Sequence, residues 1–218
     1  MTLGRCAGFQ PQGFDNIMND GTESTPSAPQ RSWTLQLSAP DCPPLDLVIY
    51  RAGDRFLQTI GQRSSGDGDH LQPIVRSLET ADAAWPASPP LQQVDSCELS
   101  AGKLGVVAVG LAGRSHWSLA VVEAGDRWRF EAACRVTTPP DWLGSTYQVE
   151  PDYDVESTDR QIEIRVADSG RLRFIANAAT RLQWDVDSRQ IRCEPGVAAT
   201  RLPATVIWTY EAIWLPNS

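Results

Sequence analysis

The sequence predicts an all-β protein, an antiparallel β-sandwich or barrel with about a dozen short strands and one short helix. From residue 31 onward apolar and polar residues alternate with a period of two, as they do in half-buried strands. Short turn sequences, such as Ala52-Gly53-Asp54 and Ala124-Gly125-Asp126, separate the alternating runs. The chain of 218 residues is 41% hydrophobic and contains eight Trp, which is enough for a sizeable core.

The alternating runs predict four hairpins between a first strand at 33–37 and a last strand at 206–210. Their paired segments are 45–49 with 55–60, 117–123 with 127–136, 162–166 with 172–174, and 182–186 with 191–193. Segment 127–136 has the clearest pattern, because its even-numbered residues from Trp128 to Val136 are all apolar. That pattern places Cys134 on the core face, where a thiol is unreactive.

One segment, at about 73–85, has helical spacing instead. Four apolar residues recur three or four positions apart, namely Ile74, Leu78, Ala81 and Trp85. A proline lies at the start and another just beyond the end, as is typical of helix boundaries.

Residues 1–29 differ in composition from the rest of the chain. They are rich in Gly, Pro, Ser, Thr, Asn and Gln and have no periodic apolar pattern. We therefore expect a disordered N-terminal leader at 1–29, followed by a single β domain at 30–218.

Charge and cysteine content limit the partners and the compartment. The net charge of −8 argues against nucleic acid, and no run approaches the roughly 20 apolar residues of a membrane span. No secretory signal is visible, and the five cysteines are an odd number, widely spaced and without a CxxC pair. We expect a soluble, acidic, cytoplasmic protein with reduced thiols, which binds an unknown protein or small ligand but neither nucleic acid nor a membrane.

His116 and Trp117 are the first candidate ligand-binding residues. They lie where the strand at 117–123 begins, so they would be near a sheet end that a small molecule could reach. Ser115 precedes His116, but adjacent residues on a strand point to opposite faces, so the two form no nucleophilic pair.

The second candidate set is acidic. Glu150, Asp152, Asp154 and Glu156 alternate with other residues, so an extended strand would place all four on one face. Such a row could bind a small ligand, could provide a carboxylate pair for glycosidase-type chemistry, or could simply be a charged edge strand. We also expect 127–136 and 147–155 to pair as antiparallel neighbours, with Arg129 opposite Asp154 or Glu156.

No stronger chemical motif is present. Phosphate-loop, dinucleotide-binding and nucleophile-elbow sequences do not occur, and the SSGDGDH loop has no glutamate at the position that a calcium loop requires. The sequence therefore predicts no cofactor and no metal, and it assigns no catalytic residue. The leading hypothesis is a non-catalytic binding or structural module. The alternatives are a β-barrel hydrolase or lyase that uses the carboxylates of 150–156 or His116, and a small-ligand carrier.

Overall fold

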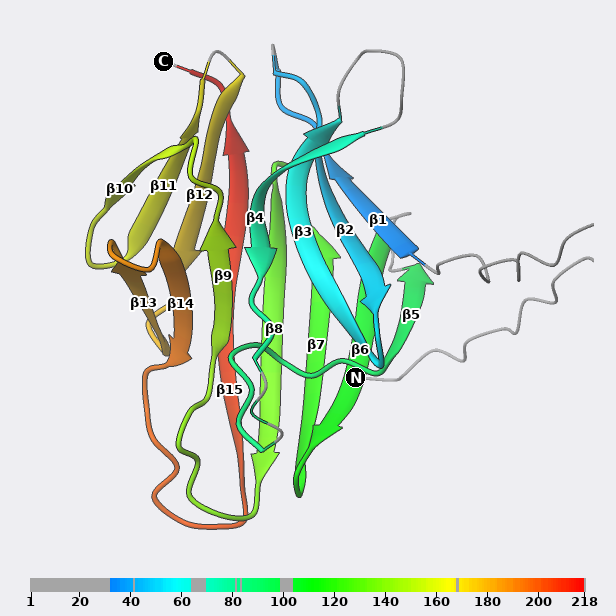
Figure 1. Cartoon of the computed structure of the whole chain (residues 1–218), viewed down its shortest axis with the longest axis vertical. Coiled ribbons are helices and arrows are strands. Elements are labelled where there is room, and N and C mark those ends of the chain that lie inside the picture. The colour runs from blue at the N-terminus through cyan, green and yellow to red at the C-terminus, as the bar shows by residue number, and fades with distance from the viewer. Residues whose placement is uncertain are drawn as a thin grey trace, which may run out of the picture. The chain divides into compact units, whose positions relative to one another are not determined.

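The computed structural model describes residues 32–40, 42–63, 70–80, 82, 84–98, 104–167 and 169–217. The predicted leader at 1–29 lies outside these residues. The described strands form two antiparallel sheets that face each other (Figure 1). In order across the 7-stranded sheet, the strands are β1 (Ser32–Leu37), β2 (Leu45–Ala52), β3 (Arg55–Arg63), β4 (Leu71–Ser77), β9 (Ser145–Val149), β14 (Gln190–Pro195) and β13 (Thr180–Asp185). In order across the 8-stranded sheet, they are β10 (Asp154–Ser157), β11 (Gln161–Val166), β12 (Gly170–Ala176), β15 (Ala204–Leu215), β8 (Arg127–Val136), β7 (Ser115–Glu123), β6 (Leu104–Ala112) and β5 (Gln93–Glu98).

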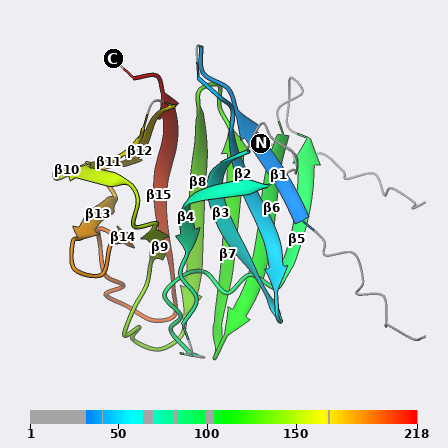
Figure 2. The same cartoon turned by 45° about the horizontal axis from the view of Figure 1, so that its top comes forward.

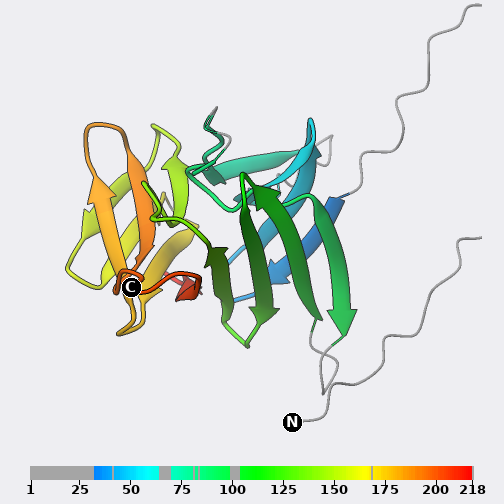
Figure 3. The same ribbon diagram turned by 90° about the horizontal axis from the view of Figure 1, so that it is seen from below.

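The fold is a β-sandwich, because the two sheets are separate and do not close into one barrel (Figure 3). All four predicted hairpins are confirmed: β2 pairs with β3, β7 with β8, β11 with β12, and β13 with β14. The turn glycines Gly53 and Gly125 have φ values of 62° and 78°, which L-residues rarely adopt. The turn glycines and the alternating apolar residues therefore both specify these hairpins. In the described part of the chain, no helix is long and apolar enough to cross a membrane.

The core between the sheets is rich in aromatic side chains. On β8 the predicted alternation is confirmed, since Trp128, Phe130 and Cys134 are fully buried while Arg129 and Arg135 are exposed. The largest buried side chains of the core are Trp117, Trp128, Trp208, Trp214, Tyr147, Tyr210, Phe130 and Phe174. Burial of side chains of this size is the main stabilising contribution to such a sandwich.

Polar side chains also connect the two sheets across the core. The Tyr147 and Tyr210 hydroxyls lie 2.7 Å apart, and the Tyr147 hydroxyl donates to Gln58 Oε1 at 3.1 Å. The Trp208 indole donates to Ser145 Oγ at 3.1 Å. Burial raises the pKa of both tyrosines above the usual range, so they stay neutral and can make these bonds. Such directional bonds fix how one sheet lies on the other.

The helix predicted at about 73–85 is wrong. Residues 71–77 form β4, and the following residues are irregular where the structure describes them. The helical spacing is overridden by burial, because Ile74 and Val75 are both fully buried and β-branched side chains suit strands. Pro73 is opposite Gly61, where the β3–β4 register shifts and the ladder tolerates a residue without an N–H.

The pairing predicted between 127–136 and 147–155 is also wrong. β8 lies between β15 and β7 in the 8-stranded sheet, whereas β9 lies between β4 and β14 in the other sheet (Figure 2). The connection after Val136 crosses from one sheet to the other, so these sequential strands are not neighbours. Arg129 faces Glu211 and Val122 across the ladders instead of an acid of 150–156.

Burial predicts a difference in thiol reactivity. Cys134 and Cys193 are fully buried, and burial raises the pKa of the Cys134 thiol to about 12 and that of Cys193 further still. Because the thiolate is the nucleophile, we expect a pulse of iodoacetamide at pH 8 to leave both unmodified in the folded protein. Partly exposed Cys97 should be modified in the same pulse, and denaturant should make all three react. Peptide mass spectrometry would measure this, and early labelling of Cys193 would contradict the buried position.

Candidate functional site

The structure places His116 and Trp117 on opposite sides of the 8-stranded sheet. His116 is exposed on the outer face of β7, opposite Arg135 of β8 and Leu111 of β6. Trp117 points into the core, where its ring makes an edge contact with Trp208 at a centroid distance of 6.0 Å. The pair therefore does not act as one site, because strand neighbours face opposite ways.

His116 does line a hollow of about 470 Å³ on this outer face. Gln93, Arg135 and Thr205 supply further polar groups, and Leu111 supplies an apolar wall. We call this the His116 hollow. Beside it, Val107, Val109 and Leu111 of β6 are 44%, 42% and 48% exposed, so the outer face is unusually apolar for a solvated strand.

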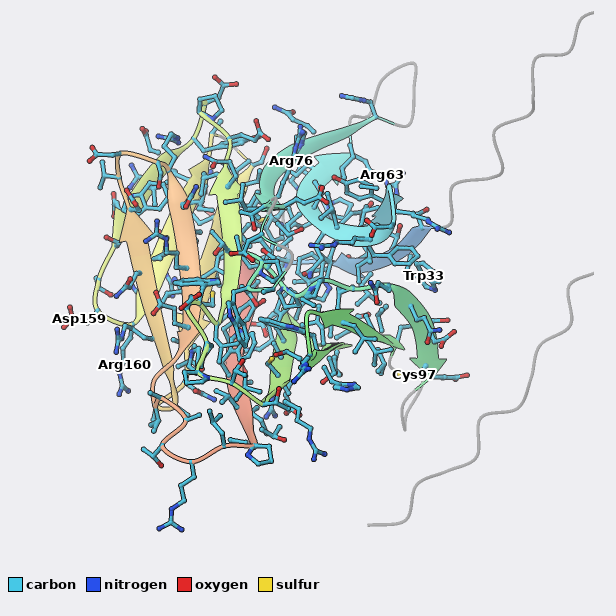
Figure 4. All side chains as sticks on the ribbon, turned by 60° about the horizontal axis from the view of Figure 1, so that its bottom comes forward. Trp33, Arg63, Arg76, Cys97, Asp159 and Arg160 are labelled. Atoms are coloured by element: carbon cyan, nitrogen blue, oxygen red, sulfur yellow. The ribbon has the colours of Figure 1, made fainter. Side chains whose placement is uncertain are left out.

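The four acids do not share one face, because the chain leaves the 7-stranded sheet after β9 and enters the other sheet at β10. Glu150 forms an ion pair at 2.9 Å with Arg76, which belongs to β4 and is labelled in Figure 4. Asp152 is exposed in the turn between the strands, and Asp154 begins β10. Glu156 pairs with Arg165 at 2.7 Å. The extended row on which the carboxylate-pair prediction depended is therefore not formed.

A different hollow, of about 420 Å³, lies on the outer face of the 7-stranded sheet. Its floor is formed by strands, with Thr146 on β9 and the neighbouring Arg192 on β14 directly opposite each other in the ladder. Its walls are formed by two connections, one after β4 that carries Trp85 and one after β8 that carries Trp142. The hollow is lined by Leu78, Thr80, Asp82, Trp85, Ala87, Trp142, Thr146, Gln190 and Arg192, and we call it the Trp142 hollow.

Hydrogen bonds hold the two wall connections together at the lower end of the sandwich in Figure 1. The Trp142 indole donates to the Ala87 carbonyl at 3.2 Å. Ser88 Oγ donates to the Thr146 carbonyl at 2.8 Å and accepts from the Thr146 amide at 3.2 Å. A Cβ at Gly144 would lie 2.8 Å from the Trp142 ring, so the ring rests directly on the Gly144 backbone. The wall is therefore built before any ligand binds.

Charges around the Trp142 hollow are mostly satisfied within the protein. Asp185 accepts from Arg192 at 3.1 Å, and the Ser188 amide, followed by Arg192, lowers the pKa of the Asp185 carboxyl. The amides of Trp85 and Ala84 donate to Asp82 Oδ1 and lower the pKa of that carboxyl. The Arg192 guanidinium also lies over the Trp142 ring, 6.0 Å from its centroid. The charged side chains around the hollow therefore already have partners within the protein, and a ligand need not carry a charge to neutralise them.

One polar atom in the hollow lacks a partner. Thr146 is only 2% exposed, and its Oγ1 has no hydrogen-bond partner among the residues that the structure describes. Leaving a buried hydroxyl unpaired costs about 1–3 kcal/mol, so this atom calls for a partner that the described chain does not supply.

Sequence reasoning missed this hollow because both tryptophans lie outside the alternating runs. Trp85 was assigned to the apolar face of a helix, and Trp142 lies in the irregular segment that follows Pro139 and Pro140. Their position was nevertheless a usable signal: a tryptophan in a proline-bounded connection has no strand face to fill and tends to be partly exposed.

Comparison with known proteins assigns neither a family nor a function to this chain. Within the described residues, no group of three or more His, Cys, Asp or Glu side chains is arranged to hold a metal ion. No protein-family model matches the chain, and neither the curated proteins nor the solved structures contain a significant match to it.

Proposed function

We propose that this protein is a non-catalytic ligand-binding module of the cytoplasm, and that its ligand occupies the Trp142 hollow. The observation that carries the proposal is the buried, unpaired Thr146 hydroxyl beneath two partly exposed tryptophans. A rigid concave site of a few hundred Å³, with aromatic walls and a few convergent polar groups, is the usual form of a small-ligand site. The odd, dispersed cysteines support the cytoplasmic assignment.

Carboxylate spacing favours binding over glycoside hydrolysis at this place. Glu194, whose pKa is raised by burial, and Asp185, whose pKa is lowered, are acids of opposite tendency beside the hollow. Asp185 is opposite Gln190 in the ladder, so Glu194 lies four residues further along β14. Four residues of strand span about 13 Å. This backbone separation exceeds the roughly 5–9.5 Å between the two carboxyl groups of a glycosidase, so it favours binding over that chemistry.

An NMR titration of the full chain against a fragment library tests the proposal. The library should contain neutral polyols, carboxylates, amines and planar heterocycles in equal numbers. We expect hits to shift the indole N–H signals of Trp85 and Trp142 and the amides of 144–148, because these groups border the hollow. The proton spectra of the hits should stay unchanged overnight, since the module does not convert its ligand.

Two matched variants locate the binding. Trp142→Ala should abolish the shifts, whereas His116→Ala, which alters the other hollow, should preserve them. Hits that perturb only the neighbours of His116, or that are chemically converted, would refute the proposal.

A further inference from the structure

We infer that the ligand of the Trp142 hollow is an uncharged oligosaccharide chain lying along the outer face of β14. This inference rests on the proposed function and adds the chemical class of the ligand. Three features support it: the aromatic walls, the mixture of unpaired donors and acceptors, and the continuity of the hollow with its neighbour along β14.

The tryptophans provide surfaces suited to sugar rings. A saccharide presents C–H groups on one face of its ring, and such a face packs against an indole, whose π surface is negative. Trp142 is held by its bond to Ala87 and by its contact with Gly144, so stacking on it costs little side-chain entropy. Trp85 forms the other wall.

The polar groups that lack a hydrogen bond favour hydroxyls as partners. Thr146 Oγ1 can donate and accept, and in the described chain no hydrogen bond engages Asp82 Oδ2 or Gln190 Nε2. A ligand that satisfies a donor, an acceptor and a hydroxyl at once must itself both donate and accept, as sugar hydroxyls do. Arg192 is already paired with Asp185, and Asp82 is nearby, so an anionic ligand would find little net attraction.

The hollow continues in both directions along the sheet. Trp142 is shared with a hollow of about 610 Å³ that reaches Pro140 and Glu194. Arg192 is shared with a hollow of about 600 Å³ that wraps around the edge strand β13 and reaches Asp159, which is labelled in Figure 4. Trp184 in that hollow lies opposite the buried Ile191, so it faces the inner side of the sheet. The Trp142 hollow and the hollow that reaches Glu194 therefore follow one another along the outer face of β14 and share the Trp142 ring, which gives room for more than one sugar ring.

Isothermal titration calorimetry of the full chain tests the inference with five neutral probes: maltohexaose, cellohexaose, xylohexaose, β-1,4-mannohexaose and chitohexaose. We expect at least one to bind with a Kd between about 10 μM and 1 mM, as is usual for open polar sites. The corresponding disaccharide should bind at least about tenfold more weakly, because it fills only one hollow. Adenosine, a planar neutral control, should not bind.

Three variants link binding to the named atoms. Trp142→Ala should weaken binding at least about tenfold, since a whole stacking surface is lost. Trp33→Ala removes a tryptophan that packs on Phe56 in another part of the sandwich, and it should leave the Kd unchanged. Thr146→Val should weaken binding while leaving the melting temperature unchanged or raised, because it removes a buried hydroxyl that has no partner in the described chain.

The outcomes separate the two proposals. If library fragments bind at Trp142 but none of the five saccharides does, the saccharide inference is wrong and the binding module stands. If neither fragments nor saccharides reach this hollow, both are wrong. If a saccharide binds equally to the wild type and to Trp142→Ala, its site lies elsewhere and the inference fails.

Discussion

Gly110→Ala is expected to destabilise the fold by about 3 kcal/mol or more, or to prevent folding. A Cβ on Gly110 would lie 1.8 Å from the Pro90 carbonyl oxygen and 2.7 Å from its carbon, which is well inside contact distance. The obstacle is backbone and not the end of a flexible side chain, so it cannot swing aside.

The obstructing segment is itself held in place. Leu91 accepts a hydrogen bond from the Phe56 amide at 2.8 Å, and the Gln92 amide donates to the Val109 carbonyl at 2.8 Å. Residues 91 and 92 thus bind β3 of one sheet and β6 of the other, and displacing them disturbs both sheets. We expect thermal unfolding of the variant to begin about 10 °C below the wild type.

Gly125→Ala is the matched control. Gly125 has a φ of 78° and no atom within 4 Å of the added Cβ, so only the left-handed backbone conformation is penalised. That penalty is about 1–2 kcal/mol. If the two alanine variants lose the same stability, the close approach at Gly110 does not exist in solution.

Much of the fold could be predicted because its strands are local patterns. Alternation and turn residues within about 20 positions specify each hairpin, so β2–β3, β7–β8, β11–β12 and β13–β14 followed from the sequence. The sheet to which each hairpin belongs is a non-local choice. The crossing between β8 and β9 depends on which pairing buries more apolar surface across the whole sandwich, and neither strand alone encodes it.

The helix at 73–85 failed for a related reason. Apolar residues at three- and four-residue spacing stabilise a helix only when one side is buried. Here the adjacent residues Ile74 and Val75 are both fully buried. Adjacent strand residues point to opposite faces, so this burial fits a strand that is covered on both faces. Tertiary packing, and not the local spacing of apolar residues, therefore determined the structure of this segment.

The candidate site was less predictable than the fold, since its residues come from separate connections. Trp85 and Trp142 line the same hollow because Trp142 bonds to Ala87 and Ser88 bonds to Thr146, contacts between residues 55 and 58 positions apart in the chain. His116 lines a hollow near the start of β7, and the binding of a ligand there stays a prediction. The acids at 150–156 were placed on one face only by assuming that the strand continued through the turn.

Trp208→Ala is expected to be among the most destabilising single changes, at about 3–5 kcal/mol. The side chain is fully buried on β15, and its ring makes an edge contact with Trp117 of β7. Removing it leaves a cavity of nearly a whole indole between the two sheets and deprives Ser145 Oγ of its donor. Denaturant unfolding, followed by circular dichroism, would measure the loss.

A double-mutant cycle separates the hydrogen bond from the cavity. Trp208→Phe keeps a ring but removes the indole donor, and Ser145→Ala removes the acceptor. Each should cost about 1–3 kcal/mol, because Ser145→Ala leaves the buried indole N–H unsatisfied and Trp208→Phe leaves Ser145 Oγ with only its hydrogen bond to Tyr210. The double variant should cost less than the sum of the two by about 1 kcal/mol, which is the coupling expected of residues in contact. Additive costs would mean that this bond does not connect the sheets.

The same cycle examines how the core supports the candidate site. Ser145 points into the core and its neighbour Thr146 points into the Trp142 hollow, because successive strand residues face opposite sides. The Trp208–Ser145 bond therefore holds β9 against the 8-stranded sheet at the place where the hollow has its floor. We expect Ser145→Ala to weaken saccharide binding by less than about threefold under conditions where it remains folded, since one buried bond among several anchors this floor. A loss as large as that of Trp142→Ala would instead show that the site depends on this single connection between the sheets.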